Sequence, residues 1–337
     1  MAARGHRVLF VGGDYGQGPY QEIDGVKVVR SYQVGRGNRI LRYPGDSISI
    51  LRAMRSAACD IYFQRCVFHQ TGRTYAFARL LRKKFVFSAG HDTNAWPTSQ
   101  LPQLHPLYAS SYRIAVRNAD LVLCQNESQR QGFKDNYARN ALLIPNMIDL
   151  SVFPKKTVRS PDRPTVLWVG TLCERKQPLN YVDLARALPQ VDFQMVAQPM
   201  TASVEAELQS GIKGISNLQY LGFVPQHKIY SLFSTASVFV NTSTTEGFPN
   251  TFLQAMAAGI PIVSLAVNPD GVVSRANAGF ACNGDDTALA DAVRRLTSSP
   301  FLCQKLGENG RSFVEKWHSV GVVCEKYEEM FQELMAK

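Results

Sequence analysis

Short apolar runs alternate along this chain with longer segments in which apolar residues recur every three to four positions. The short runs are rich in valine, leucine, isoleucine and phenylalanine, which is typical of buried parallel strands, and the longer segments have the periodicity of helices. In the first half the pattern predicts strands at residues 7–11, 27–32, 60–65, 84–89, 119–125 and 141–145. It predicts helices at residues 45–55, 71–82, 107–118 and 127–137.

A polar, basic segment with prolines at residues 155–164 interrupts this alternation and is typical of an interdomain linker. After it the pattern restarts, with strands predicted at residues 165–170, 192–197, 218–223, 237–241, 260–265 and 279–282. Helices are predicted at residues 179–188, 203–211, 226–234, 250–258, 287–297, 301–317 and 320–335. We therefore expect an α/β fold with two Rossmann-like domains, at residues 1–154 and 165–319, and a ligand cleft beyond the carboxyl ends of their strands.

The length and composition agree with this organisation. The 337 residues suit two domains, and 45% hydrophobic against 19% charged residues permit both to pack well. No apolar run reaches the roughly 18 residues of a membrane-spanning helix, and the first residues do not resemble a signal peptide, so we expect a cytoplasmic protein. The seven cysteines lack Cys-x-x-Cys spacing, which disfavours a disulfide framework or a zinc site.

The net charge of +10 and the pI near 9.3 bear on the class of partner. Nucleic acid, an anionic membrane surface and phosphorylated small molecules would each match such a charge. Apart from the cluster at residues 79–84, the basic residues look dispersed, and they lack the aromatic interleaving of single-strand binders. We expect no nucleic-acid partner and a solvated basic surface for most of these charges, and peripheral contact with an anionic membrane stays open.

The strongest chemical signal lies at residues 244–259, with the sequence TTEGFPNTFLQAMAAG. A predicted strand runs into a loop that contains Glu246, after which a helix begins. The backbone N–H groups of residues 247–251 and the positive end of this helix predict an anion site suited to a diphosphate. Asn250 and Gln254 share one helix face. Either they meet a ligand, or the segment is a capped core helix whose glutamine is satisfied within the protein.

Two further segments carry candidate residues at strand ends. Residues 169–178 follow the first strand of the second half, and Lys176 and its neighbour Arg175 can place positive charge on a diphosphate. A solvated pair of loop cations is the alternative. Residues 85–94 form a predicted strand that ends in a small-residue turn before His91. This histidine either orients a substrate or serves only the structure.

The segment at residues 244–259 resembles the donor loop of family 4 glycosyltransferases, two-domain GT-B enzymes that use nucleotide-activated sugars and retain anomeric configuration. Their motif has two glutamates separated by seven residues, and the first matches Glu246, which by resemblance binds hydroxyls of the donor sugar. Gln254 occupies the second position, a departure that weakens bonds to the ribose and implies altered nucleotide binding. By the same resemblance, Lys176 contacts the donor phosphates and His91 faces the donor sugar across the cleft.

Weaker similarity extends over nearly the whole chain. Residues 221–225 are similar to the strand end where the base stacks, and the helix at residues 320–337 is similar to one that crosses back to the first domain. Thr171 stands where the family often has arginine, and Arg175 is a candidate substitute. The donor-binding residues that the resemblance implies are Gly170, Thr171, Arg175, Phe223, Val224, Gly247, Phe248, Pro249, Asn250, Thr251 and Gln254.

The resemblance implies a reaction without a cofactor or a metal, in which the nucleotide sugar is the donor substrate. No Asp-x-Asp sequence stands at a predicted strand end, so the cationic side chains and the helix end are expected to stabilise the leaving diphosphate. Family members are thought to react on the front face of the donor, where the leaving phosphate oxygen takes the acceptor proton. A glycan or lipid-linked acceptor and a role in cell-surface polysaccharide synthesis are the corresponding expectations.

A second interpretation stays open, a degenerate GT-B protein that binds nucleotide or glycan without turnover. Gln254, Thr171 and the start of the chain favour it. Residues 2–6 resemble the end of the family's first helix and residues 7–11 its second strand, which predicts that a strand–loop–helix unit is absent from the front. A nicotinamide dehydrogenase is disfavoured because its glycine fingerprint is missing, and a GT-B epimerase fits the Glu246 loop less well than a transferase.

Overall fold

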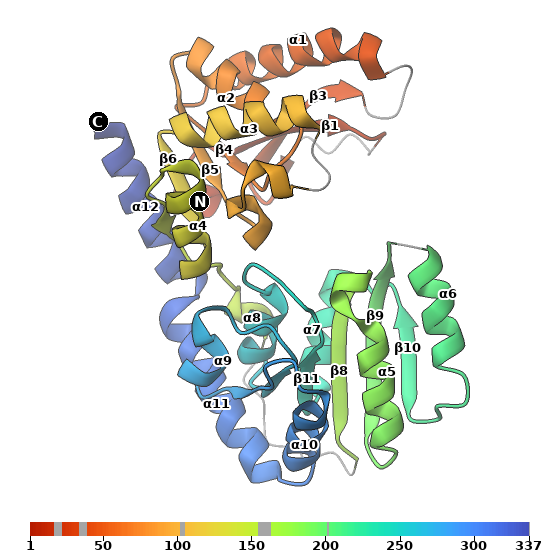
Figure 1. Ribbon diagram of the computed structural model, residues 1–337. Coiled ribbons are helices and arrows are strands. Elements are labelled where there is room, and N and C mark those ends of the chain that lie inside the picture. The colour runs from red at the N-terminus through yellow and green to blue at the C-terminus, as the bar shows by residue number, and fades with distance from the viewer. Residues whose placement is uncertain (17–21, 34–38, 102–104, 154–162, 201, 337) are drawn as a thin grey trace. The chain divides into compact units, whose positions relative to one another are not determined.

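The computed structural model describes residues 1–16, 22–33, 39–101, 105–153, 163–200 and 202–336 (Figure 1). The chain divides into two compact units. The first consists of Met1–Cys124, Gln129–Leu143 and Met330–Lys337, and the second of Gln125–Ser128 and Ile144–Glu329. The chain therefore passes between the units four times, because the short segment Gln125–Ser128 belongs to the second unit although first-unit residues flank it.

The predicted domain boundary at residue 154 and this division differ over residues 144–153. Phe153 is fully buried in a core of the second unit, and Ile148 and Leu150 pack against the same core. Burial of these apolar side chains joins the segment to the second unit. The predicted linker at residues 155–164 lies, apart from its last two residues, outside the described residues.

The described strands of the first unit form two sheets. One is parallel, in the order β4 (Ile61–Arg65), β5 (Lys84–Ser88), β6 (Leu121–Cys124) and β7 (Leu142–Leu143). In the other, β1 (Leu9–Asp14) pairs in parallel with β3 (Val26–Gln33), which pairs antiparallel with β2 (Glu22–Ile23). The two-residue strand β2 was not predicted. The Asp-Gly pair that joins it to β3 has φ of 49° at Asp24 and 76° at Gly25, as a tight hairpin turn requires.

The helices of the first unit match the four predicted segments. They are α1 (Arg39–Ala57), α2 (Thr71–Leu80), α3 (Pro106–Asn118) and α4 (Glu127–Tyr137). The core lies between the four-stranded sheet and its helices. Phe85 and Phe87 of β5, Tyr112 of α3 and Phe133 of α4 have fully buried side chains there. In contrast, no residue of β1 is buried. The expected strand–loop–helix unit ahead of residue 1 stays a prediction.

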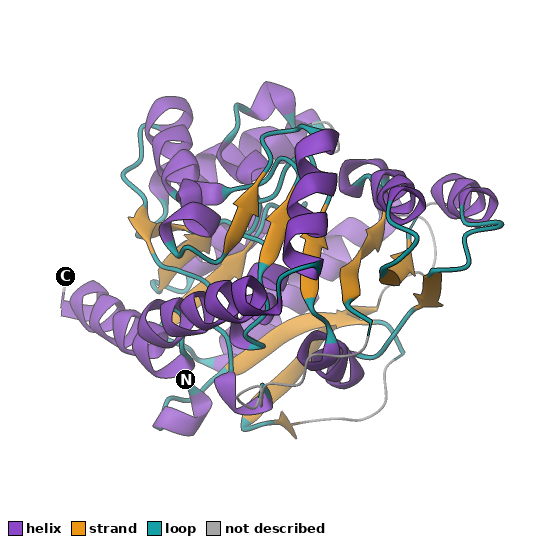
Figure 2. Ribbon diagram, turned by 90° about the horizontal axis from the view of Figure 1, so that it is seen from below, coloured by secondary structure: helices purple, strands orange, loops and turns teal. Residues whose placement is uncertain are grey.

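The second unit has one parallel sheet of six described strands, with helices on both of its faces (Figure 2). The strand order is β10 (Leu218–Gly222), β9 (Asp192–Pro199), β8 (Thr165–Leu172), β11 (Val238–Asn241), β12 (Ile262–Ser264) and β13 (Gly279–Ala281). The helices are α5 (Pro178–Ala187), α6 (Ala202–Gly211), α7 (Gln226–Thr235), α8 (Asn250–Ala257), α9 (Val272–Arg275), α10 (Asp286–Thr297) and α11 (Pro300–Trp317). The last helix, α12 (Val320–Ala336), begins in this unit, and its residues from Met330 on belong to the first unit. All predicted strands and helices of this half are present.

The strand order reverses between β8 and β11. From β8 the chain adds β9 and β10 on one side, and it then returns to add β11, β12 and β13 on the other. Such a switch point leaves a crevice beyond the carboxyl ends of the two central strands, because the loops that leave them turn in opposite directions. The loop after β8 contains Lys176 and the loop after β11 contains Glu246, so this topology brings the two strongest sequence candidates to one place.

Candidate functional site

The loops after β8 and β11 are joined to each other by main-chain and hydroxyl contacts. Thr244 donates its backbone N–H to the carbonyl of Arg175 at 2.9 Å, and the Thr242 hydroxyl donates to the carbonyl of Lys176 at 2.7 Å. The buried Trp168 indole in turn donates to the Thr242 hydroxyl at 2.9 Å. These bonds fix the backbone from which the charged side chains project.

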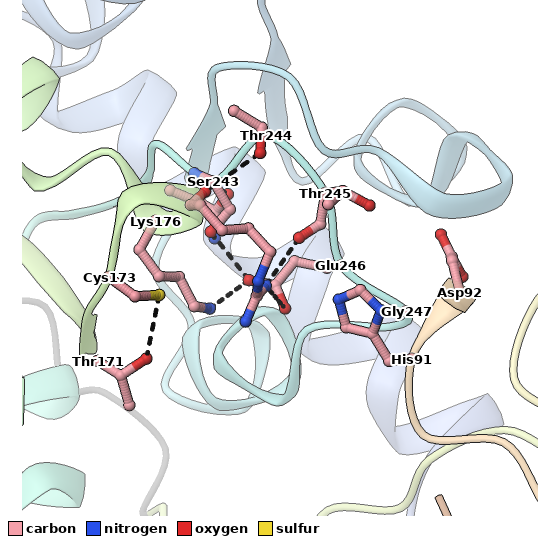
Figure 3. Close-up of polar contacts among 12 residues, drawn as sticks. His91, Asp92, Thr171, Cys173, Lys176, Ser243, Thr244, Thr245, Glu246 and Gly247 are labelled. Atoms are coloured by element: carbon pink, nitrogen blue, oxygen red, sulfur yellow. Dashed lines mark hydrogen bonds and ion pairs between the residues drawn. The ribbon is translucent and has the colours of Figure 1, made fainter. Parts of the chain in front are cut away.

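Three side chains meet the carboxylate of Glu246 (Figure 3). Lys176 forms an ion pair and hydrogen bond with Oε1, Arg175 lies 3.2 Å from Oε2, and Ser243 donates its hydroxyl to Oε1 at 2.9 Å. The side chains of Glu246 and Lys176 are only 12% and 15% exposed. Lys176 and Arg175 are neighbours in sequence, yet both reach the same carboxylate. Ser243 was missed by the sequence analysis because nothing in a single serine after a strand distinguishes it.

The electrostatics of this cluster favour the ionised carboxylate. Burial alone would raise the pKa of Glu246, but the positive Lys176, its hydrogen bond, the positive Arg175 and the Ser243 hydroxyl together outweigh burial and lower that pKa below its usual value. Glu246 therefore carries a negative charge at neutral pH, held against two cations. Such an arrangement of shifted pKa and paired charges beside a pocket is a candidate binding or catalytic site.

A pocket of about 350 Å³ opens beside this cluster. Its lining residues come from β8 and β9, from the loops after β8 and β10, and from helices α7 and α8; they are Val169, Gly170, Thr171, Arg175, Lys176, Val196, Gln198, Phe223, Val224, Ile229 and Thr251. Phe223 lines the pocket, and its side chain is 66% exposed. The pocket thus combines cations at one part of its wall with an exposed aromatic ring and aliphatic side chains, which suits a ligand with an anionic group and a flat ring.

The remaining residues of the predicted donor loop have other neighbours. Asn250 begins α8, and its side chain accepts a hydrogen bond from Asn146 at 3.0 Å. The Phe248 ring lies 5.3 Å from the His318 ring, between centroids. Gln254 is half-buried on α8, one turn after Asn250. Gly247 and Pro249 complete the loop. Of these residues, none is among those that line the described pocket.

His91 lies in the first unit, at the end of β5, where it begins a short 3₁₀ helix at Asp92–Ala95. Its Nδ1 accepts the backbone N–H of Thr93 at 3.2 Å, and the Asn94 side chain accepts the backbone N–H of His91 at 3.2 Å. Because Nδ1 accepts here, a neutral ring carries its proton on Nε2. The Asp92 carboxylate accepts from Gln129 at 2.9 Å. His91 therefore has a capping role in its own unit, and a role toward a sugar stays a prediction.

A buried polar network that bonds to the predicted donor loop was also missed. Its members are Gln125, Asn126, Asn146 and His318, all at most 8% exposed. Asn126 donates to the Gly247 carbonyl at 3.0 Å, and Asn146 donates to the Phe248 carbonyl at 3.2 Å. The only sequence signal was that two asparagines each follow a predicted strand closely, which did not reveal that both would meet one remote loop.

Within the described part of the chain, no group of three or more histidine, cysteine, aspartate or glutamate side chains lies close enough together to hold a metal ion. Among the same residues, no helix combines the length and the apolar character that crossing a membrane requires.

Two family models match the chain, one for each half. The model described as "Glycosyl transferase 4-like domain" matches residues 1–147, and the model described as "Glycosyl transferases group 1" matches residues 163–299. Together they cover most of the chain.

Curated relatives and solved structures agree with these matches. The chain is 25% identical over 272 residues to the alpha-maltose-1-phosphate synthase of Mycolicibacterium smegmatis, covering 72% of this chain and 70% of the relative. It is 26% identical over 211 residues to a GDP-mannose-dependent alpha-(1-6)-phosphatidylinositol dimannoside mannosyltransferase of Mycobacterium tuberculosis, covering 59% and 55%. Its fold is similar to that of sucrose-phosphate synthase from Thermosynechococcus elongatus, with a TM-score of 0.80 at 19% identity, over 99% of this chain and 90% of the other. The TarM of S. aureus, solved in complex with UDP among other ligands, gives a TM-score of 0.70 at 14% identity, over 85% and 59%.

Proposed function

Because the chain belongs to the family 4 glycosyltransferases and has their GT-B fold, we propose that it transfers a sugar, with retention of configuration, from a nucleotide-diphosphate donor to a glycan or lipid-linked acceptor. The observation that carries this proposal is the cluster of Lys176 and Arg175 around Glu246 at the wall of the pocket. It supplies two positive charges for a diphosphate and one carboxylate that accepts hydrogen bonds from sugar hydroxyls.

Different residues around the pocket would bind the diphosphate, the base and the sugar of the donor. The diphosphate would lie against Lys176 and Arg175, which stabilise the negative charge that grows on the leaving group. The base would stack on Phe223, whose ring is largely exposed, and contact the adjacent Val224. Glu246 would meet the donor sugar. In this proposal the side-chain cations replace the divalent ion that many nucleotide sites use, so transfer is metal-independent.

The names of the relatives support the acceptor class. Besides the maltose-phosphate and phosphatidylinositol mannoside enzymes, the chain is 30% identical over 103 residues to the CapM capsular polysaccharide biosynthesis glycosyltransferase of Staphylococcus aureus, covering 30% of this chain and 27% of the relative. Their names refer to a sugar phosphate, a mannosylated phosphatidylinositol and a capsular polysaccharide. We propose that this chain likewise extends a glycan or a lipid-linked sugar in cell-surface polysaccharide synthesis.

The test is calorimetric titration of the whole chain with UDP, GDP and ADP, with EDTA and with Mg²⁺, followed by assay of nucleotide release from the matching nucleotide sugars. We expect one diphosphate to bind equally well with EDTA, and its sugar to be turned over. Binding without turnover would favour the degenerate binding protein instead. An absolute requirement for Mg²⁺, or no binding of any diphosphate, would refute the assignment of the cations.

We propose that the protein is cytoplasmic and contacts an anionic membrane through its first unit, and the charge distribution supports this contact. Residues 30–119 contain 14 lysines and arginines but only three acidic residues, so this segment carries +11 and the rest of the chain −1. The basic residues had looked dispersed in the sequence pattern, but this count shows that most of the net charge lies in one segment. On α3 the exposed side chains include Arg113, Ile114 and Arg117, and Leu107 is 74% exposed two turns earlier. This mixed basic and apolar surface suits anionic headgroups.

Vesicle flotation tests this contact. We expect the chain to float with phosphatidylglycerol-containing vesicles and not with phosphatidylcholine alone, and Leu107→Ser with Ile114→Ser to reduce the floated fraction severalfold. Phe301→Ser is the matched control, because Phe301 is equally exposed, at 76%, but lies on α11 of the second unit. Equal flotation of all variants with both lipids would contradict the proposal.

A further inference from the structure

The donor loop is bonded on its two sides by different parts of the second unit. On one side, Lys176, Arg175 and Ser243 bond the Glu246 side chain. On the other side, the backbone carbonyls of Gly247 and Phe248 accept hydrogen bonds from buried asparagine side chains. Asn126 and Asn146 reach these carbonyls from 121 and 102 residues away in the sequence.

Asn146 is the centre of the second set of contacts. Its side-chain amide donates both to the Phe248 carbonyl, at 3.2 Å, and to the side-chain oxygen of Asn250, at 3.0 Å. Its side-chain oxygen accepts from Gln125 at 2.5 Å. These three bonds fix the orientation of the Asn146 amide, because donor and acceptor ends are both engaged.

The main chain of Asn146 is anchored as well. Its carbonyl lies 2.7 Å from Nδ1 of His318, a residue that is 4% exposed. A carbonyl can only accept, so Nδ1 of His318 carries the proton and donates it. The same histidine accepts the Ile148 backbone N–H at its own carbonyl, at 2.8 Å, and its ring lies against Phe248. His318 thus braces both the asparagine and the loop that the asparagine holds.

From this geometry we infer that Asn126 and Asn146 are positioning residues, which hold the main chain of residues 247–250 so that the Glu246 carboxylate stands at the correct place for the donor sugar. The inference deepens the proposed function and rests on it. The pocket cations project from the loop after β8, and residues 247–250 are not among those that line the pocket. Loss of the asparagines is therefore expected to move the sugar-binding carboxylate more than the phosphate site.

The expected consequence is a loss of turnover without an equal loss of nucleotide affinity. A misplacement of a reacting or orienting group by about 1 Å can lower a rate on the order of a hundredfold. We therefore expect Asn146→Ala to lower kcat for nucleotide release from the donor by about ten- to a hundredfold, while Kd for the free diphosphate changes less than about threefold. Asn126→Ala should act in the same direction and more weakly, because Asn126 holds one carbonyl of the loop rather than a carbonyl and a side chain.

The matched control is Asn217→Ala. Asn217 lies in the same unit, and its amide donates to the carbonyls of Ala185, Leu188 and Val191 at 3.0, 3.1 and 3.0 Å, far along the sequence from the donor loop. Its loss should lower Tm as the loss of Asn146 does, but leave kcat of the folded protein within about twofold. If Asn146 had only a structural role, Asn146→Ala and Asn217→Ala would have similar kcat and similar diphosphate Kd. A loss of kcat without loss of diphosphate affinity in Asn146→Ala alone indicates the positioning role.

The experiment measures kcat, diphosphate Kd and Tm for the parent chain and the three variants. If Asn146→Ala and Asn126→Ala both keep the parent's kcat, or lose diphosphate affinity as much as kcat, the positioning role is refuted. If Asn146→Ala does not fold, Asn126→Ala decides alone. Failure of the parent chain to bind any diphosphate or to release nucleotide from any sugar donor is a different result, because it refutes the proposed function before the variants are compared.

Discussion

The loops that follow β5 in the first unit and β11 in the second both leave a buried parallel strand, and both carry a candidate residue, but they obtain their partners differently. His91 bonds to Thr93 and Asn94, within three positions of itself, and completes a short helical turn. Glu246 pairs with Lys176 and Arg175, about 70 residues away. Any turn supplies local partners, whereas remote charges converge on one largely buried carboxylate only when a tertiary fold brings them there. The comparison teaches that Glu246 is the better candidate for chemistry.

The largest effect that tests this comparison is expected at Glu246. Glu246→Ala should lower sugar transfer by about a hundredfold or more, because an electrostatic contact to the reacting sugar is lost, while diphosphate affinity changes only a few-fold. His91→Ala should mainly destabilise the first unit, by about 1 kcal/mol for the lost cap, and lower transfer much less than Glu246→Ala does. Initial rates at saturating donor measure both. A larger loss at His91 than at Glu246 would reverse the comparison and place the key contact in the first unit.

The next largest effect is expected on nucleotide binding. Charge-assisted hydrogen bonds contribute roughly 1.5–3 kcal/mol, so Lys176→Ala should weaken diphosphate binding by on the order of tenfold or more in calorimetry. Arg175→Ala should weaken it less, because Arg175 is 35% exposed and its charge is better screened. Arg294→Ala, which removes an exposed arginine from α10, is the control. Equal affinity of the Lys176 variant and the parent would remove the phosphate role from this lysine.

A smaller effect is expected from Gln254. Replacing this amide by the carboxylate that the family usually has should strengthen hydrogen bonds to the ribose by about 1 kcal/mol, or roughly fivefold in affinity. Gln254→Glu is therefore expected to bind the nucleotide more tightly, with the exposed α6 residue Gln209→Glu as a control for added negative charge. No gain in affinity would mean that Gln254 does not face the ribose, which agrees with its absence from the pocket lining among described residues.

The smallest expected effect concerns pH and the network behind the donor loop. Burial lowers the pKa of His318, and the positive Lys326 and Arg275 add to this against the opposing hydrogen bond to Asn146. The unfolded chain then binds more protons at this residue than the folded one, so the stability that His318 contributes is present above the ordinary histidine pKa and is lost as pH falls below that value through the lowered folded pKa. His318→Gln should flatten this part of the stability curve, measured as Tm between about pH 7 and 5. An unchanged slope would exclude His318 as its source.

Acid should weaken the Glu246 cluster in a lower pH range. The pKa of Glu246 is lowered, so the stability that it contributes is present above the ordinary glutamate pKa and is lost as pH falls through the lowered folded value. The two groups therefore titrate in separate windows, and Glu246→Gln leaves the histidine window in place. This separation distinguishes the charged side of the donor loop from its hydrogen-bonded side.

Much of the fold could be predicted because its signals are local. Apolar runs and helical periodicity identified the strands and helices of the second unit except the four-residue helix α9, which is too short to show a period, since buried parallel strands and amphipathic helices differ in the sequence itself. The short strand β2 was missed because two residues give too little pattern, although the Asp24-Gly25 turn carried a signal. The Glu246 and Lys176 segments were identified because each follows a predicted strand and because each resembles a family motif.

What the sequence by itself determined is the order of elements, the α/β class and the candidate residues on each loop. Only the tertiary structure decided that β8 and β11 lie side by side, that Arg175 and Lys176 both reach Glu246, and that Asn126, Asn146 and His318 support the next residues of that loop. The physical reason is that strand order and side-chain direction depend on contacts between segments about 70 to 170 residues apart, which no local pattern of hydrophobic and polar positions encodes.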